Sequence, residues 1–170
     1  MTTNNGLSGV EICPVTLLDI PEIAALHARV FGPGRFSRTA YRIREDAPRV
    51  SRYCQQALVA GRLVAAVSFT EIEVGTKTDA LLLGPLAVAP EFASQGLGRI
   101  LITAGLDKAK QHGIAVVFLV GDQSYYARLG FGGVPAGQIK LPGPVDPSRL
   151  LVWQAEPDAI KGYSGMMTAG

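Results

Sequence analysis

The sequence predicts a mixed α/β (α+β) fold: a twisted, mostly antiparallel sheet with one splayed parallel pair of strands, flanked by helices. Two strand-like segments, residues 56–60 and 63–74, surround a glycine turn in the pattern of a β-hairpin. The apolar segment 114–120 follows a helical segment, 97–112, which itself follows the strand-like segment 80–88. A strand, a helix and a strand in that order form a crossover, so the two strands are parallel.

The N-terminal part predicts a strand over residues 10–17 and then a helix. Asp19 is a suitable N-cap and Pro21 falls in the first turn. The apolar side chains recur at helical spacing, at Ile23, Leu26, Val30 and Phe31. Gly32-Pro33-Gly34 ends this helix, and a second, more polar helix is expected over residues 37–46.

Gly84-Pro85 interrupts the strand expected over residues 80–88, which follows turn-forming residues 75–79. Proline has no N–H to donate to a ladder, so the pair predicts a bulge or a local parting of neighbouring strands. The helix over residues 97–112 has an apolar side and a basic C-terminal end.

The C-terminal part predicts a short helix over residues 122–129, closed by Gly130, and a late strand over residues 150–155. No repeat or low-complexity linker divides the chain. We therefore expect one domain over residues 1–170.

The composition is that of a globular protein, with 48% hydrophobic and 18% charged residues. A formal net charge of +2 and scattered basic residues argue against a nucleic-acid-binding surface. The densest basic cluster is Arg35, Arg38, Arg42 and Arg44. It is either a solvated helix face or a binding site for a phosphate or carboxylate.

We expect a cytoplasmic protein that does not interact with a membrane. Cys13 and Cys54 lie far apart without metal-ligand spacing, as buried free thiols in a reducing compartment do. The first six residues lack the pattern of a secretory signal, and no apolar stretch approaches about 20 residues. His27 and His112 are expected to be structural, and Trp153 belongs to the core or to a dimer contact.

The segment from Gly84 to Arg99 carries the clearest chemical signal. A strand stops at Pro90, and a loop with Gly96 and Gly98 opens directly onto a helix. Helix N-terminal amides bind anions, and glycine lets a phosphate approach the backbone. The segment lacks the Walker motif, and Leu101 stands where a dinucleotide fingerprint needs its third glycine. The alternative is a tight turn whose glycines serve only packing.

Two motifs resemble the Gcn5-related N-acetyltransferases (GNAT). Val88-Ala89-Pro90-Glu91-Phe92 followed by Gln95-Gly96-Leu97-Gly98 is similar to their acyl-CoA pyrophosphate loop. Tyr126-Ala127-Arg128-Leu129-Gly130-Phe131 is similar to their Tyr-x-x-x-Gly-Phe segment. The resemblance covers about residues 10–157 and extends, in residues 31–36 and 141–147, to a bacterial subgroup of predicted acetyltransferases. Ala93 departs from it, because the family usually has Gln or Arg there.

The resemblance implies acetyl-CoA as co-substrate and no metal. The residues that it places on the cofactor are Leu86, Ala87, Val88, Ser94, Gln95, Gly96, Leu97, Gly98, Arg99 and Tyr126. The Val88 amide would donate to the thioester carbonyl, and Tyr126 would protonate the departing thiolate. Glu71 is preferred as general base; Glu71 and Glu73 share a strand face, and both could equally be exposed strand carboxylates.

The function expected from the resemblance is N-acetyl transfer. The acetyl group passes from acetyl-CoA to a primary amine of a small molecule or peptide by direct attack in a ternary complex. The alternative is a non-catalytic module that binds or senses acyl-CoA, which Ala93 favours and Tyr126 opposes. Transfer of a longer acyl group and a homodimer formed through the late strands are further options.

Overall fold

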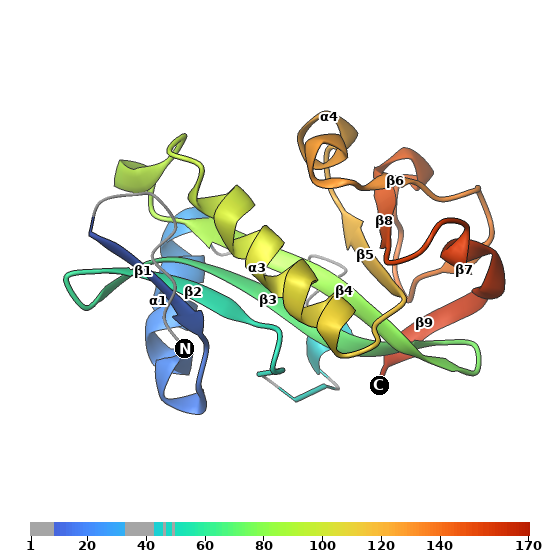
Figure 1. Ribbon diagram of the computed structural model, residues 1–170, viewed down its shortest axis with the longest axis horizontal. Helices are drawn as coiled ribbons and strands as arrows, with labels where there is room; N and C mark the ends of the chain where they lie inside the picture. Colours follow the sequence, from blue (N-terminus) through green and yellow to red (C-terminus); the bar gives the residue numbers. More distant parts are fainter. Residues whose placement is uncertain (1–8, 33–42, 46, 49) are drawn as a thin grey trace.

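A twisted sheet forms the frame of the protein in the computed structural model, which describes residues 9–32, 43–45, 47–48 and 50–170 (Figure 1). The strand order is β1-β2-β3-β4-β5-β8-β6, and β9 pairs with β3 and β7. The strands are β1 Val10–Pro14, β2 Gln55–Val59, β3 Arg62–Val74, β4 Lys77–Val88, β5 Val116–Val120, β6 Gly132–Gly133, β7 Ile139–Lys140, β8 Leu150–Gln154 and β9 Gly165–Ala169.

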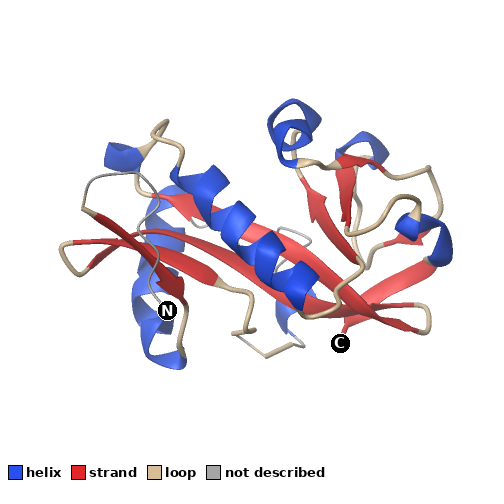
Figure 2. Cartoon of the chain, in the orientation of Figure 1, coloured by secondary structure: helices blue, strands red, loops and turns tan. Residues whose placement is uncertain are grey.

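The α-helices are α1 Ile20–Phe31, α3 Leu97–Gln111 and the short α4 Gln123–Tyr126. Short 3-10 helices cover Leu17–Asp19, Pro90–Phe92, Ala127–Leu129, Pro147–Arg149 and Ala159–Gly162. Figure 2 shows how these helices surround the sheet.

Helices α1 and α3 cover opposite faces of the sheet. The core beneath α3 includes Ala65 and Val67 of β3, whereas Ala66 of the same strand packs with Leu26 of α1. Successive side chains of a strand point to opposite faces, so this alternation places one helix on each side. The result is the helix-flanked sheet that the sequence predicts.

The expected mixture of strand directions is confirmed. Strands β1 to β4 are antiparallel neighbours, and β4 and β5 are parallel across the α3 crossover. Ala60 and Gly61 form the turn between β2 and β3, with φ of 50° and 78°. Positive φ at both positions suits a two-residue hairpin. A second, two-residue parallel contact joins β7 and β9, which the sequence does not predict.

Several expected boundaries are wrong by a few residues. The first strand ends at Pro14, because Leu17–Asp19 form a 3-10 turn in which the Asp19 carboxylate accepts from the Thr16 amide at 2.8 Å. Strand β4 starts at Lys77, which pairs with Val74, so the turn is shorter than the expected 75–79. It runs on through Gly84-Pro85, where its register with β3 shifts. Of the helix expected over residues 37–46, residues 43–45 are helical, and the others lie outside the described residues.

Candidate active site

The parallel pair of strands separates halfway along β4. The ladder between β4 and β5 joins Ala80–Leu82 to Val116–Phe118. Beyond it, β4 continues to Val88 and β5 to Val120, but the two strands no longer pair with each other. The ladder between β3 and β4 shifts at the same place, because two residues, Gly84 and Pro85, oppose the single Ser68. This two-against-one arrangement is a β-bulge. The parting of strands that the sequence predicts at Gly84-Pro85 is therefore confirmed.

The backbone of β4 beyond the bulge faces the separated edge. The Ala89 amide donates to the Val64 carbonyl of β3 at 2.8 Å. Backbone N–H groups of a strand alternate between its two edges. The amides of Val88 and Leu86 therefore point away from β3, toward the side that β5 has left.

The loop after β4 brings backbone amides to the N-terminus of α3. Gly96 is the N-cap residue with φ 82°, a left-handed conformation that favours glycine, and Ser94 also has a positive φ of 62°. The first-turn amides of a helix have no acceptor within the helix. Gly98 follows in that turn, where a Cβ atom would lie 3.0 Å from the Tyr125 hydroxyl. Gly98 is buried, and its lack of a side chain lets Leu86 and the Tyr125 hydroxyl approach the first turn of α3.

A cavity of about 410 Å³ lies over this helix terminus. Two exposed arginines, Arg99 of α3 and Arg128 after α4, line it together with the exposed Tyr125. The other lining residues are Val88, Phe92, Ala93, Ser94, Gly96, Leu97, Gly98 and Leu129, so none is acidic. Amides, a helix N-terminus and two guanidinium groups make this cavity suited to an anion.

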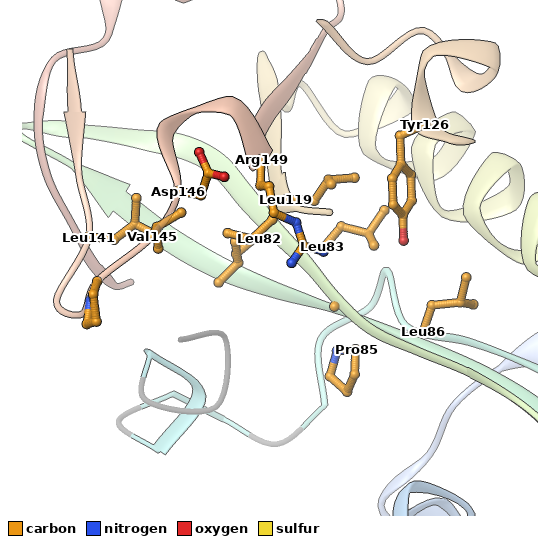
Figure 3. A pocket seen from close by; sticks show the side chains of 13 residues that line it. Leu82, Leu83, Pro85, Leu86, Leu119, Tyr126, Leu141, Val145, Asp146 and Arg149 are labelled. Atoms are coloured by element: carbon orange, nitrogen blue, oxygen red, sulfur yellow. The ribbon is translucent and has the colours of Figure 1, made fainter. Parts of the chain in front are cut away.

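A second cavity, of about 390 Å³, occupies the split between the strands (Figure 3). Its walls come from β4, from the end of β5 with Tyr126, and from the segment before β8. The lining residues are Leu82, Leu83, Gly84, Pro85, Leu86, Leu119, Val120, Tyr126, Leu141, Pro144, Val145, Asp146 and Arg149. Leu86 lies between the two cavities: it lines the split, and its Cδ2 atom lies 3.0 Å from the position of a Cβ on Gly98, which lines the anion cavity.

Tyr126 is held at the split by aromatic neighbours. Its ring meets Tyr125 edge-on at 4.8 Å between centroids and Phe131 at 5.8 Å. A side chain on Gly121 would collide with the Tyr126 ring, at 2.6 Å from its Cε2 atom. Figure 3 shows the hydroxyl pointing into the opening. The ring is thus fixed by packing while its polar end faces the cavity.

Two charged residues line the cavity at the split. The Asp146 carboxylate accepts from the Ser148 amide at 3.0 Å and from its hydroxyl at 2.8 Å. These two hydrogen bonds hold the pKa of Asp146 below its usual range. Arg149 lies 3.8 Å from the Asp122 carboxylate, measured from Nη2 to Oδ1.

Most residues that the sequence predicts for the cofactor line one of the cavities. Leu86 and Tyr126 line the cavity at the split, and six others line the anion cavity: Val88, Ser94, Gly96, Leu97, Gly98 and Arg99. Gln95 lines neither cavity. Ala87 is buried, packs with α1 on the other face of the sheet and lines neither cavity.

Glu71 does not line either cavity. It lies exposed on β3, opposite Leu81, at a level where β4 and β5 are still paired. The carboxylate that does line the split is Asp146. Arg35 and Arg38, considered for a phosphate or carboxylate, lie outside the described residues, and the Arg44 side chain belongs to neither cavity.

Three charged residues that line the cavities were not predicted as site residues from the sequence: Arg128, Asp146 and Arg149. Arg128 could have been found, since it follows Tyr125 by three residues, and helical residues three apart share a face. Asp146 and Arg149 lie in a turn-rich segment with no periodic signal. They reach the split only because β8 pairs with β5.

Two further searches cover the described part of the chain. Within it, no three His, Cys, Asp or Glu side chains gather as a metal-binding group. No helix in the same residues is long and apolar enough to cross a membrane.

Comparison with known proteins agrees with this geometry. The acetyltransferase (GNAT) family description matches residues 20–131, which include both the glycine loop and the Tyr126 segment. The chain belongs to the GNAT family. Helix α3, the loop before it and the split between β4 and β5 all lie within the matched residues.

GNAT relatives are similar along most of the chain. It is 30% identical over 155 residues to the uncharacterized N-acetyltransferase YhbS of Escherichia coli strain K12, covering 88% of this chain and 90% of the relative. It is 28% identical over 159 residues to the uncharacterized N-acetyltransferase YjhQ of the same strain, covering 85% of each. A crystal structure of Escherichia coli YhbS in complex with CoA superposes with a TM-score of 0.81 at 26% identity, covering 99% and 93% of the two chains.

Proposed function

We propose that this GNAT protein is one acyltransferase domain that moves the acetyl group of acetyl-CoA to a primary amine of a small molecule or peptide, in a reducing, cytoplasmic setting. The observation that carries the proposal is the junction of the two cavities at Leu86. The anion cavity over the N-terminus of α3 lies next to the edge of β4 that has separated from β5. The Tyr126 hydroxyl faces the cavity at this split.

The residues present fit a CoA thioester. The α3 first-turn amides, Arg99 and Arg128 would hold its phosphates, as helix termini and guanidinium groups do. The backbone of Leu86 and Val88 would pair with the amides of its pantetheine arm. Gly98 supports this fit, because a side chain there would occupy the corner between Leu86 and Tyr125. The CoA complex of the relative YhbS supports the same ligand.

The bound thioester supplies the acetyl group, and the protein residues would handle charge and protons around it. A β4 amide that points away from β3 would donate to the thioester oxygen, either Val88 as predicted from the sequence or Leu86, which lines the split with Tyr126. Such an interaction is worth about 3–4 kcal/mol in comparable oxyanion sites. As the amine nitrogen bonds to the carbonyl carbon and the C–S bond breaks, Tyr126 would give its proton to the sulfur. The substrate ammonium must lose one proton before it attacks, and the nitrogen loses a second proton as the amide forms, which would restore the Tyr126 hydroxyl.

We propose Asp146 as the group that receives the proton of the acceptor amine. Among the described residues it is the acidic side chain that lines the split; the Ser148 hydrogen bonds that lower its pKa hold it in place but make it a weaker base. Glu71, preferred from the sequence, remains a prediction to be tested beside it. A non-catalytic acyl-CoA sensor is the second candidate, favoured by Ala93 in place of the usual Gln or Arg.

The experiment that tests acetyl transfer is thiol release from acetyl-CoA on addition of a panel of primary amines. An enzyme releases CoA in proportion to acetylated amine, identified by mass spectrometry. A sensor would also bind acetyl-CoA but would release no CoA thiol with any amine of the panel. Tyr126→Phe, which removes only the hydroxyl, is the matched control for background thioester hydrolysis.

A further inference from the structure

Arg149 places a positive charge at the acceptor end of the split. The residue lies where β8 begins, and its carbonyl accepts from the Gly121 amide at 2.9 Å, which fixes its backbone beside the end of β5. Its side chain lines the cavity and is 52% exposed. Figure 3 shows the guanidinium extending toward the β4 side chains Leu82 and Leu83.

Neither nearby carboxylate neutralises this guanidinium strongly. Asp122 lies 3.8 Å away, near the limit of an ion pair, and its side chain is 77% exposed. Such exposed pairs contribute little, and solvent screens them. Asp146 binds Ser148, and Figure 3 shows its carboxylate directed away from the Arg149 nitrogens. The guanidinium can therefore take a bidentate carboxylate ligand without breaking a strong contact.

Apart from Asp146 and Tyr126, the side chains that line this cavity with Arg149 are apolar. Leu82, Leu141, Pro144 and Val145 form the wall near Arg149. The cavity of about 390 Å³ is of the size that holds a small molecule, and the acyl end of the donor must share it. A cation beside an apolar wall selects a ligand that combines a carboxylate with a hydrocarbon side chain.

We propose that the acceptor is an amino acid with a free carboxylate and an apolar side chain, and that Arg149 binds the carboxylate. This inference rests on the proposed acetyl transfer, because it names the acceptor of that site. The side chain lies against Leu82, Leu141 and Val145, and the amine faces the acetyl group near Tyr126. An amine without a carboxylate leaves Arg149 paired only with Asp122.

The test uses leucine and two analogues that each lack one group. Isocaproate keeps the carboxylate and side chain but has no amine, so its binding to the CoA-loaded protein is read by calorimetry without turnover. Leucinamide keeps the amine but has a neutral amide in place of the carboxylate. We expect isocaproate to bind, and leucine to be acetylated with a kcat/KM at least about tenfold above that of leucinamide.

Variants at Arg149 separate charge recognition from general damage. Arg149→Gln should weaken isocaproate binding at least about tenfold, whereas Arg149→Lys should retain part of it. Lys161→Gln is the matched control, because it removes the same charge from a side chain that is 77% exposed and lines neither cavity. Calorimetric titration of CoA verifies that each variant still binds the cofactor.

The outcomes separate this inference from the proposed function. Equal kcat/KM for leucine and leucinamide, preference for amidated peptides, absence of isocaproate binding, or binding unchanged in Arg149→Gln would each overturn the role of Arg149. Isocaproate binding that depends on Arg149 without acetylation of any amine would support the recognition site and contradict the catalytic proposal.

Discussion

Leu86 and Gly98 are in contact across the junction of the two cavities: a Cβ on Gly98 would lie 3.0 Å from the Leu86 Cδ2 atom. The Tyr125 hydroxyl is equally close to that position. The separated part of β4, the first turn of α3 and the short helix α4 thus meet at one glycine. The anion cavity and the cavity at the split therefore lie on either side of the contact between Leu86 and Gly98.

Tyr126→Phe should lower kcat for acetyl transfer by about a hundredfold or more, the usual range for a lost general acid. The ring contacts with Tyr125 and Phe131 remain, so acetyl-CoA affinity should stay within about twofold. Steady-state thiol release and calorimetry on the same preparations measure both quantities. An unchanged kcat would remove Tyr126 from the chemistry.

Asp146→Asn and Glu71→Gln should behave differently if Asp146 receives the amine proton. Asparagine still caps the 3-10 helix at Pro147 but has no charge, so folding is preserved while kcat/KM falls by about a hundredfold. Glu71→Gln should leave kcat/KM within about twofold, since Glu71 lines neither cavity. The reverse result would restore Glu71 as the base.

Gly105→Ala should destabilise the protein although alanine favours helices. A Cβ at Gly105 would overlap the Phe69 ring of β3, which is 1% exposed and cannot move aside. Overpacking costs about 1–3 kcal/mol, against a helix-propensity gain of about 1 kcal/mol. Urea unfolding should show a net loss of up to about 2 kcal/mol. Thr103→Ala, at an exposed site on α3, should not destabilise, and a stabilised Gly105→Ala would mean that the contact is looser than described.

Tyr163 should make stability sensitive to alkaline pH. Burial, and then the hydrogen bond that its hydroxyl donates to Asp79, raise the pKa of Tyr163 above its ordinary value. A raised pKa in the folded state means that the stabilisation is fully present below the unfolded value of about 10 and is lost as pH rises beyond it.

Tyr163→Phe should therefore flatten the fall in unfolding free energy between about pH 10 and pH 12. It should also cost about 1 kcal/mol at neutral pH through the lost hydrogen bond. Urea denaturation at several pH values measures both effects. If the unfolding free energy falls with pH equally steeply in wild type and Tyr163→Phe, other groups cause the alkaline loss of stability. Tyr125→Phe, at an exposed tyrosine, is the control.

The parts of the fold that follow from local pattern could be predicted from the sequence. Helices α1 and α3 have apolar side chains at helical spacing, and glycines at their ends mark where they stop. The hairpin of β2 and β3 and the bulge at Gly84-Pro85 also depend on residues close in sequence. The GNAT resemblance adds the roles that we expect for the loop before α3, which would bind the cofactor, and for Tyr126, which would donate a proton.

The remaining features depend on pairing between distant residues. Strand β9 is defined by its contacts with Ile72–Val74 of β3, almost a hundred positions earlier, and its own residues carry no strand pattern. Arg149 reaches the split only through the ladder between β8 and β5. Local sequence therefore identifies the cofactor side of the site better than the acceptor side.

Binding of acetyl-CoA, with and without a side chain at Gly98, tests the central claim most directly. Calorimetry would compare wild type with Gly98→Trp, Arg128→Gln and the control Gly162→Trp, which adds the same indole at an open, exposed position. Circular dichroism verifies that each variant folds. We predict saturable binding to wild type and Gly162→Trp, weaker binding to Arg128→Gln and none to Gly98→Trp. Absence of binding to wild type at millimolar acetyl-CoA, or full binding to a folded Gly98→Trp, would contradict the account.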